Sequence, residues 1–135
     1  MPVTLLHCAL QPGESIFDQL VFAAKKAVIS GELRPGQDFP SVRLLATQFK
    51  IHPNTAHKVV QHLIQQQWLE SRPGIGTVVA TIPDPRPGER KQLLRREVDQ
   101  LAVEAKRVGL ELREVIQAIE EHWARLEKHQ EVGRK

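Results

Sequence analysis

The sequence predicts a mainly α-helical protein with one small β-hairpin, built as a winged helix-turn-helix domain followed by a C-terminal two-helix dimerisation hairpin. Three observations predict this fold class. Residues 15–67 carry three apolar patterns of helical period, residues 68–80 are typical of two short strands around a Pro-Gly turn, and residues 94–126 carry two more helical seams. A segment with three prolines at 82–88 suggests a stiff linker between domains at 1–81 and 89–135.

The first expected helix covers residues 15–30. Its apolar residues, among them Phe17, Leu20 and Ala24, recur at steps of three and four and therefore line one side. Gly31 ends this helix. The following GELRPG segment (31–36) is typical of a turn, because Pro35 fixes φ and a glycine at position 36 permits a positive φ. A loop therefore separates the first helix from the second.

The second expected helix is short and begins after Ser41, whose hydroxyl suits an N-cap. Its apolar residues fall at i, i+3, i+4 and i+7, which predicts one buried face, and the helix should end near Lys50. They are Val42, Leu45, Ala46 and Phe49.

A third helix should begin at Pro53, since a missing N–H costs nothing at the first helical position, and run to about Gln67. At 100° per residue its aliphatic residues gather on one side and its polar residues on the other. The aliphatic side holds Ala56, Val59, Val60 and Leu63, and the polar side holds Asn54, Lys58, Gln61 and Gln65.

Two amphipathic helices joined by a turn of about four residues, the second exposing hydrogen-bonding side chains, make a helix-turn-helix. Between positions 41 and 80 four bases accompany a single acid, Glu70, which gives a local basic patch although the whole chain carries only +3. We therefore expect double-stranded DNA as the partner, with Lys58 and Gln61 facing it.

Residues 68–72 and 77–80 are expected to form the strands of a wing around residues 73–76 (PGIG). Arg72 lies at the predicted tip together with Gly74 and Gly76. Because glycines carry no side chain, the backbone there could approach a DNA groove closely.

Two apolar seams of about twenty residues each predict the helices of the tail, with Gly109 between them. An isolated helical hairpin leaves much of such seams in water, so we expect a homodimer that pairs through this segment. The predicted dimerisation residues are Leu94, Val98, Leu101, Ala105, Leu112, Ile116, Ile119, Trp123 and Leu126.

Other classes of protein find little support in the sequence. No nucleophile, phosphate-loop or zinc motif is present, so we expect neither an enzyme nor a cofactor. The chain also lacks an apolar stretch long enough for a membrane span and a secretion leader, so we expect a cytoplasmic protein that does not contact membranes. The single cysteine, Cys8, is expected to be a packed thiol.

The histidines do not predict a metal site either. His52, His57 and His62 follow one another at steps of five residues, which rotate each by about 140° around a helix and prevent convergence on one ion. His122 and His129 share a face, but two helical turns place them about 10 Å apart.

Residues 12–80 resemble the DNA-binding domain of the GntR family of bacterial regulators. The resemblance rests on residues 31–36 (GELRPG), 40–43 (PSVR), 45–46 (LA), 54–55 (NT) and 69–78 (LESRPGIGTV). The rest of the chain, with residues 51–55 (IHPNT), is similar to the YtrA-type subfamily, whose members have a short two-helix tail.

The resemblance implies DNA contacts at the start of the second helix, along the first turns of the third, and at the wing glycines. An arginine at the start of the second helix can form two hydrogen bonds with a guanine or a phosphate, and free N–H groups at helix starts can bind phosphate. Where many members carry arginines on the third helix, this chain has Pro53 and His57, and Leu44 replaces a common capping-box glutamate. The implied contact residues are Ser41, Arg43, Pro53, Asn54, Thr55, His57, Lys58 and Gln61.

These observations predict a sequence-specific transcription regulator, and we expect a repressor that binds a pseudo-palindromic operator. Two alternatives stay open. The tail dimer could hold a small molecule or a metal and act as a sensor. The winged helix could instead bind protein, although the Asn/Thr/Lys/Gln face of the third helix does not favour this.

Overall fold

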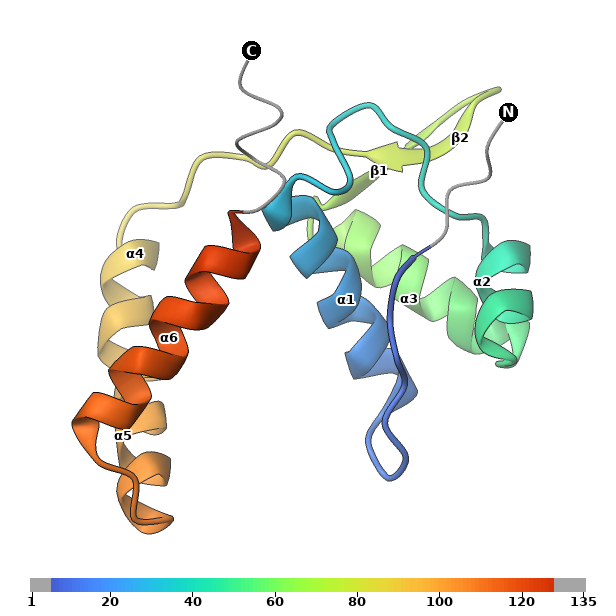
Figure 1. Ribbon diagram of the computed structural model, residues 1–135. Coiled ribbons are helices and arrows are strands. Elements are labelled where there is room, and N and C mark those ends of the chain that lie inside the picture. The colour runs from blue at the N-terminus through green and yellow to red at the C-terminus, as the bar shows by residue number, and fades with distance from the viewer. Residues whose placement is uncertain (1–5, 128–135) are drawn as a thin grey trace. The chain divides into compact units, whose positions relative to one another are not determined.

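The computed structural model describes residues 6–127 and confirms the predicted fold class, mostly helical with one two-stranded hairpin (Figure 1). Two compact units divide between Ile82 and Pro83. The elements in chain order are α1 (Ile16–Ser30), α2 (Val42–Phe49), α3 (Pro53–Gln65), β1 (Leu69–Arg72), β2 (Gly76–Val79), α4 (Glu89–Gln92), the π-helical turn η1 (Leu93–Glu97), α5 (Val98–Arg107) and α6 (Leu112–Leu126).

Helix α1 has the two ends that the sequence predicts. The Ser15 hydroxyl oxygen accepts a hydrogen bond from the Asp18 backbone N–H at 3.2 Å, which satisfies one of the free donors of the first turn. Gly31 adopts a left-handed conformation with φ 85° and ends the helix, as glycine does without steric cost.

Helices α2 and α3 are joined by a tight turn. Lys50 closes α2 in a left-handed conformation with φ 54°, and Ile51 and His52 then lead to Pro53, the first residue of α3. α3 ends at Gln65 rather than near Gln67, where we expected it to end. The reason is that Gln67 takes a positive φ of 67°, which turns the chain so that Trp68 donates its backbone N–H to the Leu63 carbonyl.

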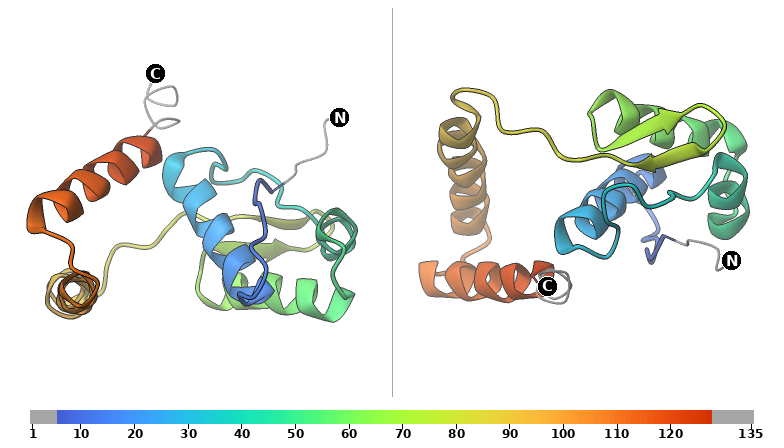
Figure 2. Two further views of the ribbon diagram at one scale, coloured as in Figure 1. Left: turned by 60° about the horizontal axis from the view of Figure 1, so that its bottom comes forward. Right: turned by 90° about the horizontal axis from the view of Figure 1, so that it is seen from above.

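The wing is an antiparallel pair in which Leu69 lies opposite Val79 and Arg72 opposite Gly76. The first strand ends at Arg72 as expected, and the other strand ends lie one residue from their expected positions. The loop after α1 also pairs with β2, which the sequence did not predict: Gly36 N–H donates to the Val79 carbonyl at 2.8 Å, and Phe39 N–H to the Thr77 carbonyl at 2.9 Å. The hairpin thus lies beside the helices and is tied to them through this loop (Figure 2).

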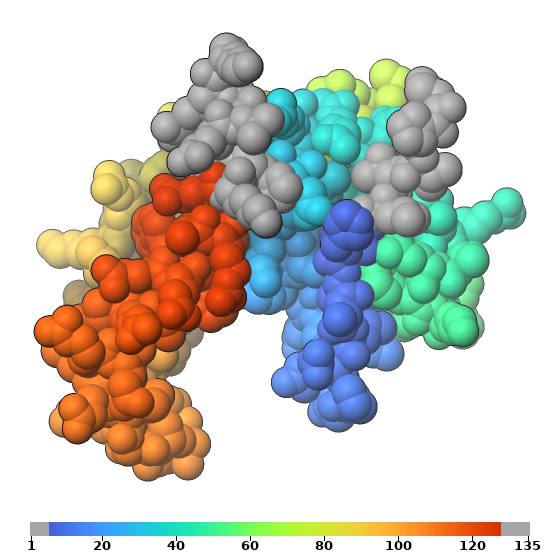
Figure 3. Space-filling view, in the orientation of Figure 1, coloured from blue at the N-terminus to red at the C-terminus, as the bar shows by residue number. Residues whose placement is uncertain are grey.

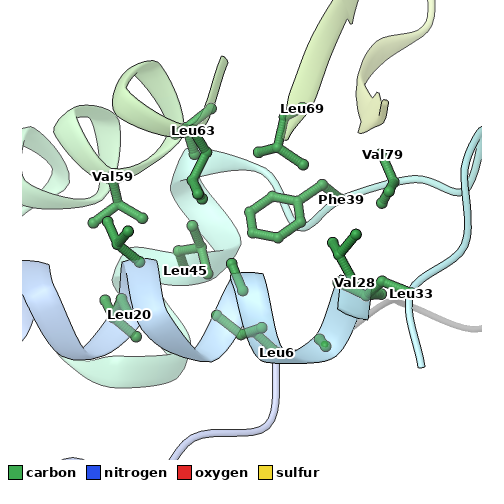
Figure 4. Close-up of a cluster of buried hydrophobic side chains, with 14 of the residues drawn as sticks. Leu6, Leu20, Val28, Leu33, Phe39, Leu45, Val59, Leu63, Leu69 and Val79 are labelled. Carbon is green, nitrogen blue, oxygen red and sulfur yellow. The ribbon is translucent and has the colours of Figure 1, made fainter. Parts of the chain in front are cut away.

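One hydrophobic cluster holds the first unit together (Figure 4). Its centre consists of Leu20 of α1, Leu45 of α2, and Val59 and Leu63 of α3, each with 0% of its surface exposed. Burial of such side chains stabilises a fold by roughly 1.5–3 kcal/mol each. The three helices are therefore locked against one another by their predicted apolar faces.

The segment before α1 completes this cluster, which we did not predict. Leu6 is 1% exposed, and its carbonyl accepts a hydrogen bond of 2.6 Å from the Gln48 side-chain amide of α2. The space-filling view shows this segment lying against the helices (Figure 3). Cys8 packs against the cluster as expected, and burial raises the pKa of its thiol despite the opposing charge of Lys26.

The second unit contains one helical run from α4 through α5, then α6. Gly109, with φ 81°, lies between them as predicted. The π-helical turn at η1 has no signal in the apolar pattern, and α6 covers 15 residues rather than about twenty. None of the helices between residues 6 and 127 is both long and apolar enough to cross a bilayer.

Replacing Leu45 with alanine should lower the free energy of unfolding by about 2–5 kcal/mol, because it leaves a cavity where α2 meets the cluster. Urea denaturation followed by circular dichroism measures this. Thr47→Ala, an exposed position of the same helix, is the control and should stay within about 0.5 kcal/mol of wild type. Equal losses in both variants would contradict the packing described.

Candidate nucleic-acid interface

The outer face of α3 is exposed and polar, opposite the side that packs into the cluster. Ala56, Val59, Val60 and Leu63 are buried, as predicted. The polar residues lie in solvent, with Thr55 half-buried at the edge of the face. The exposed residues are Pro53, Asn54, His57, Lys58, Gln61 and Gln65.

The start of α2 presents a hydroxyl and a guanidinium. The Ser41 Oγ accepts a hydrogen bond of 3.1 Å from the Leu44 backbone N–H, so the predicted cap forms without a glutamate at position 44. The hydroxyl proton of Ser41 stays available to an acceptor such as a phosphate oxygen. Arg43 is exposed and forms no ion pair with any residue between 6 and 127.

The cap of α3 is His52, a role that we did not predict. Its Nδ1 accepts a hydrogen bond of 3.0 Å from the Asn54 backbone N–H. The signal was present, because the residue before a proline at the first helical position is the N-cap position. His52 therefore fixes the first turn of α3, from which Asn54 and Thr55 project.

The wing differs from its predicted electrostatics. The positive charge of Arg72 is not unpaired, because its guanidinium forms an ion pair of 2.8 Å with the Glu70 carboxylate. Both side chains are about half exposed. Gly74 and Gly76 adopt positive φ values of 77° and 113° and have open space around them. Ile75, between them, is 65% exposed at the tip and was also missed.

On the surface formed by α2, α3 and the wing, three cations have no carboxylate partner among the described residues. They are Arg43, Lys50 and Lys58. The only acid between positions 41 and 80 is the one already paired with Arg72. Exposed, unneutralised cations beside polar side chains are suited to phosphates and base edges.

Two of the three histidines at positions 52, 57 and 62 are engaged in structural contacts. His52 caps α3, and the His62 ring packs edge-on against Phe17 at a centroid distance of 5.3 Å. No group of three metal-ligating side chains gathers within residues 6–127, and His129 lies outside the described residues. Trp68 is half-buried against the cluster, with the Lys25 ammonium 5.6 Å from its ring centroid.

The tail exposes most of the apolar residues predicted for dimerisation. Leu94, Leu112 and Trp123 are 64–74% exposed, and Val98, Leu101, Ile116 and Ile119 are 43–49% exposed. Ala105 is an exception, since it is already buried in the single chain, and Leu126 is half-buried. Further exposed apolar residues that we did not assign are Leu93, Val103, Val108 and Leu110.

Comparison with protein families and curated proteins gives consistent matches. The family model described as bacterial regulatory proteins, gntR family, matches residues 12–79. The HTH-type transcriptional repressor YtrA of Bacillus subtilis is 30% identical over 107 residues, which are 78% of this chain and 82% of YtrA. The uncharacterized HTH-type transcriptional regulator YhcF of the same organism is 28% identical over 109 residues, 81% of this chain and 90% of YhcF.

Solved structures share the fold. A transcriptional antiterminator from Listeria monocytogenes EGD-e superimposes with a TM-score of 0.77 at 22% identity, covering 93% of this chain and 95% of that one. A transcriptional regulator from Oenococcus oeni reaches a TM-score of 0.57 at 26% identity, covering 84% and 94%.

Proposed function

Because the chain belongs to the GntR family of bacterial transcription regulators, we propose that it binds a pseudo-palindromic DNA operator as a homodimer and represses transcription. Its homologues and its fold are those of regulators with a DNA-binding helix-turn-helix, not of enzymes. We assign residues 1–81 to DNA binding, 82–88 to a linker and 89–135 to dimerisation. As a regulator of bacterial genes, the protein would act in the cytoplasm.

The observation that carries this proposal is the exposed polar face of α3, which is held outward by a fully buried underside. An α-helix fits the major groove of B-DNA, where each base pair presents its own pattern of donors and acceptors. Asn54, Gln61 and Lys58 provide side chains that read adenine and guanine edges, and Thr55 and His57 lie beside them.

The other contacts would position this helix on the duplex. Arg43 and Ser41 at the start of α2 would bind phosphate or guanine, and Arg72, Gly74 and Gly76 would bring the wing against the backbone. Arg72 would exchange its Glu70 partner for phosphate.

The dimer is supported by the apolar surface of the tail. Large hydrophobic side chains such as Trp123, Leu112 and Leu94 are mostly in water in the single chain, and a second copy would cover them. Two α3 helices in a dimer would enter successive major grooves about 34 Å apart, which makes the operator pseudo-palindromic. Repression is supported by the name of the Bacillus subtilis relative.

Selection of bound duplexes from a random DNA pool tests this function. We expect inverted half-sites whose centres lie about 10 base pairs, or a multiple, apart. Affinity for the selected duplex should also fall steeply as salt is raised, because phosphate contacts release counterions. Failure to enrich any sequence would overturn the proposal.

Arg43→Ala should weaken binding to the selected operator by about 1–3 kcal/mol, because this exposed guanidinium has no other partner in the described chain. Fluorescence anisotropy with a labelled duplex measures the loss. Arg113→Ala, which removes an exposed arginine from α6, is the matched control. If the two variants bind equally well, Arg43 is not a contact.

Glu70→Gln should strengthen binding to any duplex by a few fold, since it releases Arg72 from its ion pair and removes a negative charge beside the phosphates. A surface pair of this kind contributes about 0.2–1 kcal/mol, which sets the size of the effect. The control is Glu120→Gln in α6, which makes the same change of charge far from the wing in sequence. Weaker binding by Glu70→Gln, or an equal gain in the control, would exclude the wing from the interface.

A further inference from the structure

The charged residues of the tail are distributed unevenly along the chain, with basic residues near its start and acidic residues after them. Residues 86–96 contain five Lys/Arg and one Asp/Glu, a balance of +4, whereas residues 97–127 contain four and eight, a balance of −4. The nearly neutral total of the tail conceals this division. A basic segment therefore spans the end of the linker and the start of the tail, and an acidic stretch follows at 97–127. Residues 128–135 then contain three Lys/Arg and one Asp/Glu.

The basic side chains of this segment are exposed and mostly free of acidic partners. Arg90, Lys91 and Arg95 form no ion pair or hydrogen bond through their side chains with any described residue. Arg96 has only a 3.8 Å contact with the adjacent Glu97. Asp99 lies one turn from Arg95, so an intrahelical pair was available in sequence but does not form.

The junction of linker and helix is held in place by a reciprocal contact. The Arg86 backbone N–H donates to the Glu89 carboxylate at 2.9 Å, and the Glu89 backbone N–H donates to the Arg86 carbonyl at 3.0 Å. This contact engages the carboxylate of the one acid of the segment, and the Arg86 guanidinium has no ion-pair partner among residues 6–127. The cations from position 86 to 95 thus follow one another in sequence from the end of the linker through α4 into η1.

The connection to the wing is short. Arg86 lies ten positions after Gly76, the nearest in sequence of the proposed wing contacts, and such a connection spans at most about 35 Å. This is close to the roughly 34 Å of one turn of duplex. A wing that lies on DNA therefore keeps the start of the basic segment within about one duplex turn of its own contacts.

We propose that residues 86–96 form a second DNA-contacting segment that binds phosphates beside those reached by the wing. This inference rests on the proposed function and adds a contact surface outside the helix-turn-helix. A duplex carries one negative charge about every 1.7 Å along its axis, so several phosphates are available to these four cations. The acidic stretch 97–127 is repelled by the same phosphates, so the basic segment is the part of residues 86–127 that its charge suits to DNA.

The competing use of these cations is an ion-pair contact with the acidic half of a second copy's tail. DNA is favoured because the cations are concentrated at the end of the tail nearest in sequence to the wing, whereas the acids are spread over the following 31 residues. The two uses predict different effects on operator binding and on the oligomeric state.

The test compares the salt dependence of operator binding by the full-length protein and two variants of equal charge. One variant carries Arg90→Gln, Lys91→Gln and Arg95→Gln. The control carries Lys106→Gln, Arg113→Gln and Arg125→Gln, three cations of the acidic region. Glutamine retains the helix propensity of the basic residues, and circular dichroism of both variants should match wild type.

For the first variant, the slope of log K against log salt should fall by about 0.9 for each phosphate that the protein no longer neutralises, and we expect a fall of at least about 2 per dimer. Affinity near 0.1 M salt should drop at least about tenfold, because a slope change of this size acts over the whole salt range. The control should retain the wild-type slope. Arg90→Lys with Arg95→Lys preserves the charges and should retain the slope as well.

Each other outcome has a distinct meaning. An unchanged slope in the first variant, with wild-type protein binding normally, would overturn this inference alone. A first variant that becomes monomeric in sedimentation would assign the cations to the second copy and also overturn it. Absence of wild-type binding to any duplex would overturn the proposed function, and this inference with it.

Discussion

The burial of one side of α3 fixes the rotation of that helix about its own axis, and every assignment on its outer face depends on this rotation. Val59 and Leu63 lie in the same cluster as Leu20 of α1 and Leu45 of α2 (Figure 4). A turn of the helix by one residue, about 100°, would move Lys58 toward the cluster and leave an aliphatic residue outside. Exposing such residues and burying a charge are both costly, so the outer face is well determined.

The parts of this fold that depend on local signals could be predicted from the sequence. Ser15, Ser41 and Pro53 mark helix starts, and Gly31 and Gly109 mark helix ends, because capping and positive φ are properties of a few adjacent residues. Periodicity likewise identified the buried face of each helix in the first unit.

The features that were missed depend on contacts between distant residues. The burial of Leu6 and the pairing of residues 36–39 with β2 arise only when the chain is folded, so no local pattern indicates them. The π-helical turn could not be predicted from the spacing of apolar residues either. The Glu70–Arg72 pair is different, because residues two apart in a strand share a face and alternation alone could have predicted it.

The two units contribute different properties to the regulator. The first holds the polar side of α3 toward solvent, and the second leaves apolar side chains such as Trp123 exposed and separates its charges along the chain. The exposed surface supports pairing with a second copy, and the charge separation supports a tail whose start is drawn toward DNA. In the proposed function, both units contribute to placing two α3 helices on one duplex.

A double-mutant cycle between Gln61 or Asn54 and single base pairs of the selected operator tests most directly whether the outer face of α3 reads base edges. Changing the base pair read by such a side chain should cost wild-type protein about 1–3 kcal/mol and cost the corresponding alanine variant almost nothing. Base readout by α3 would be contradicted if every base change had the same cost in wild type and in both α3 variants.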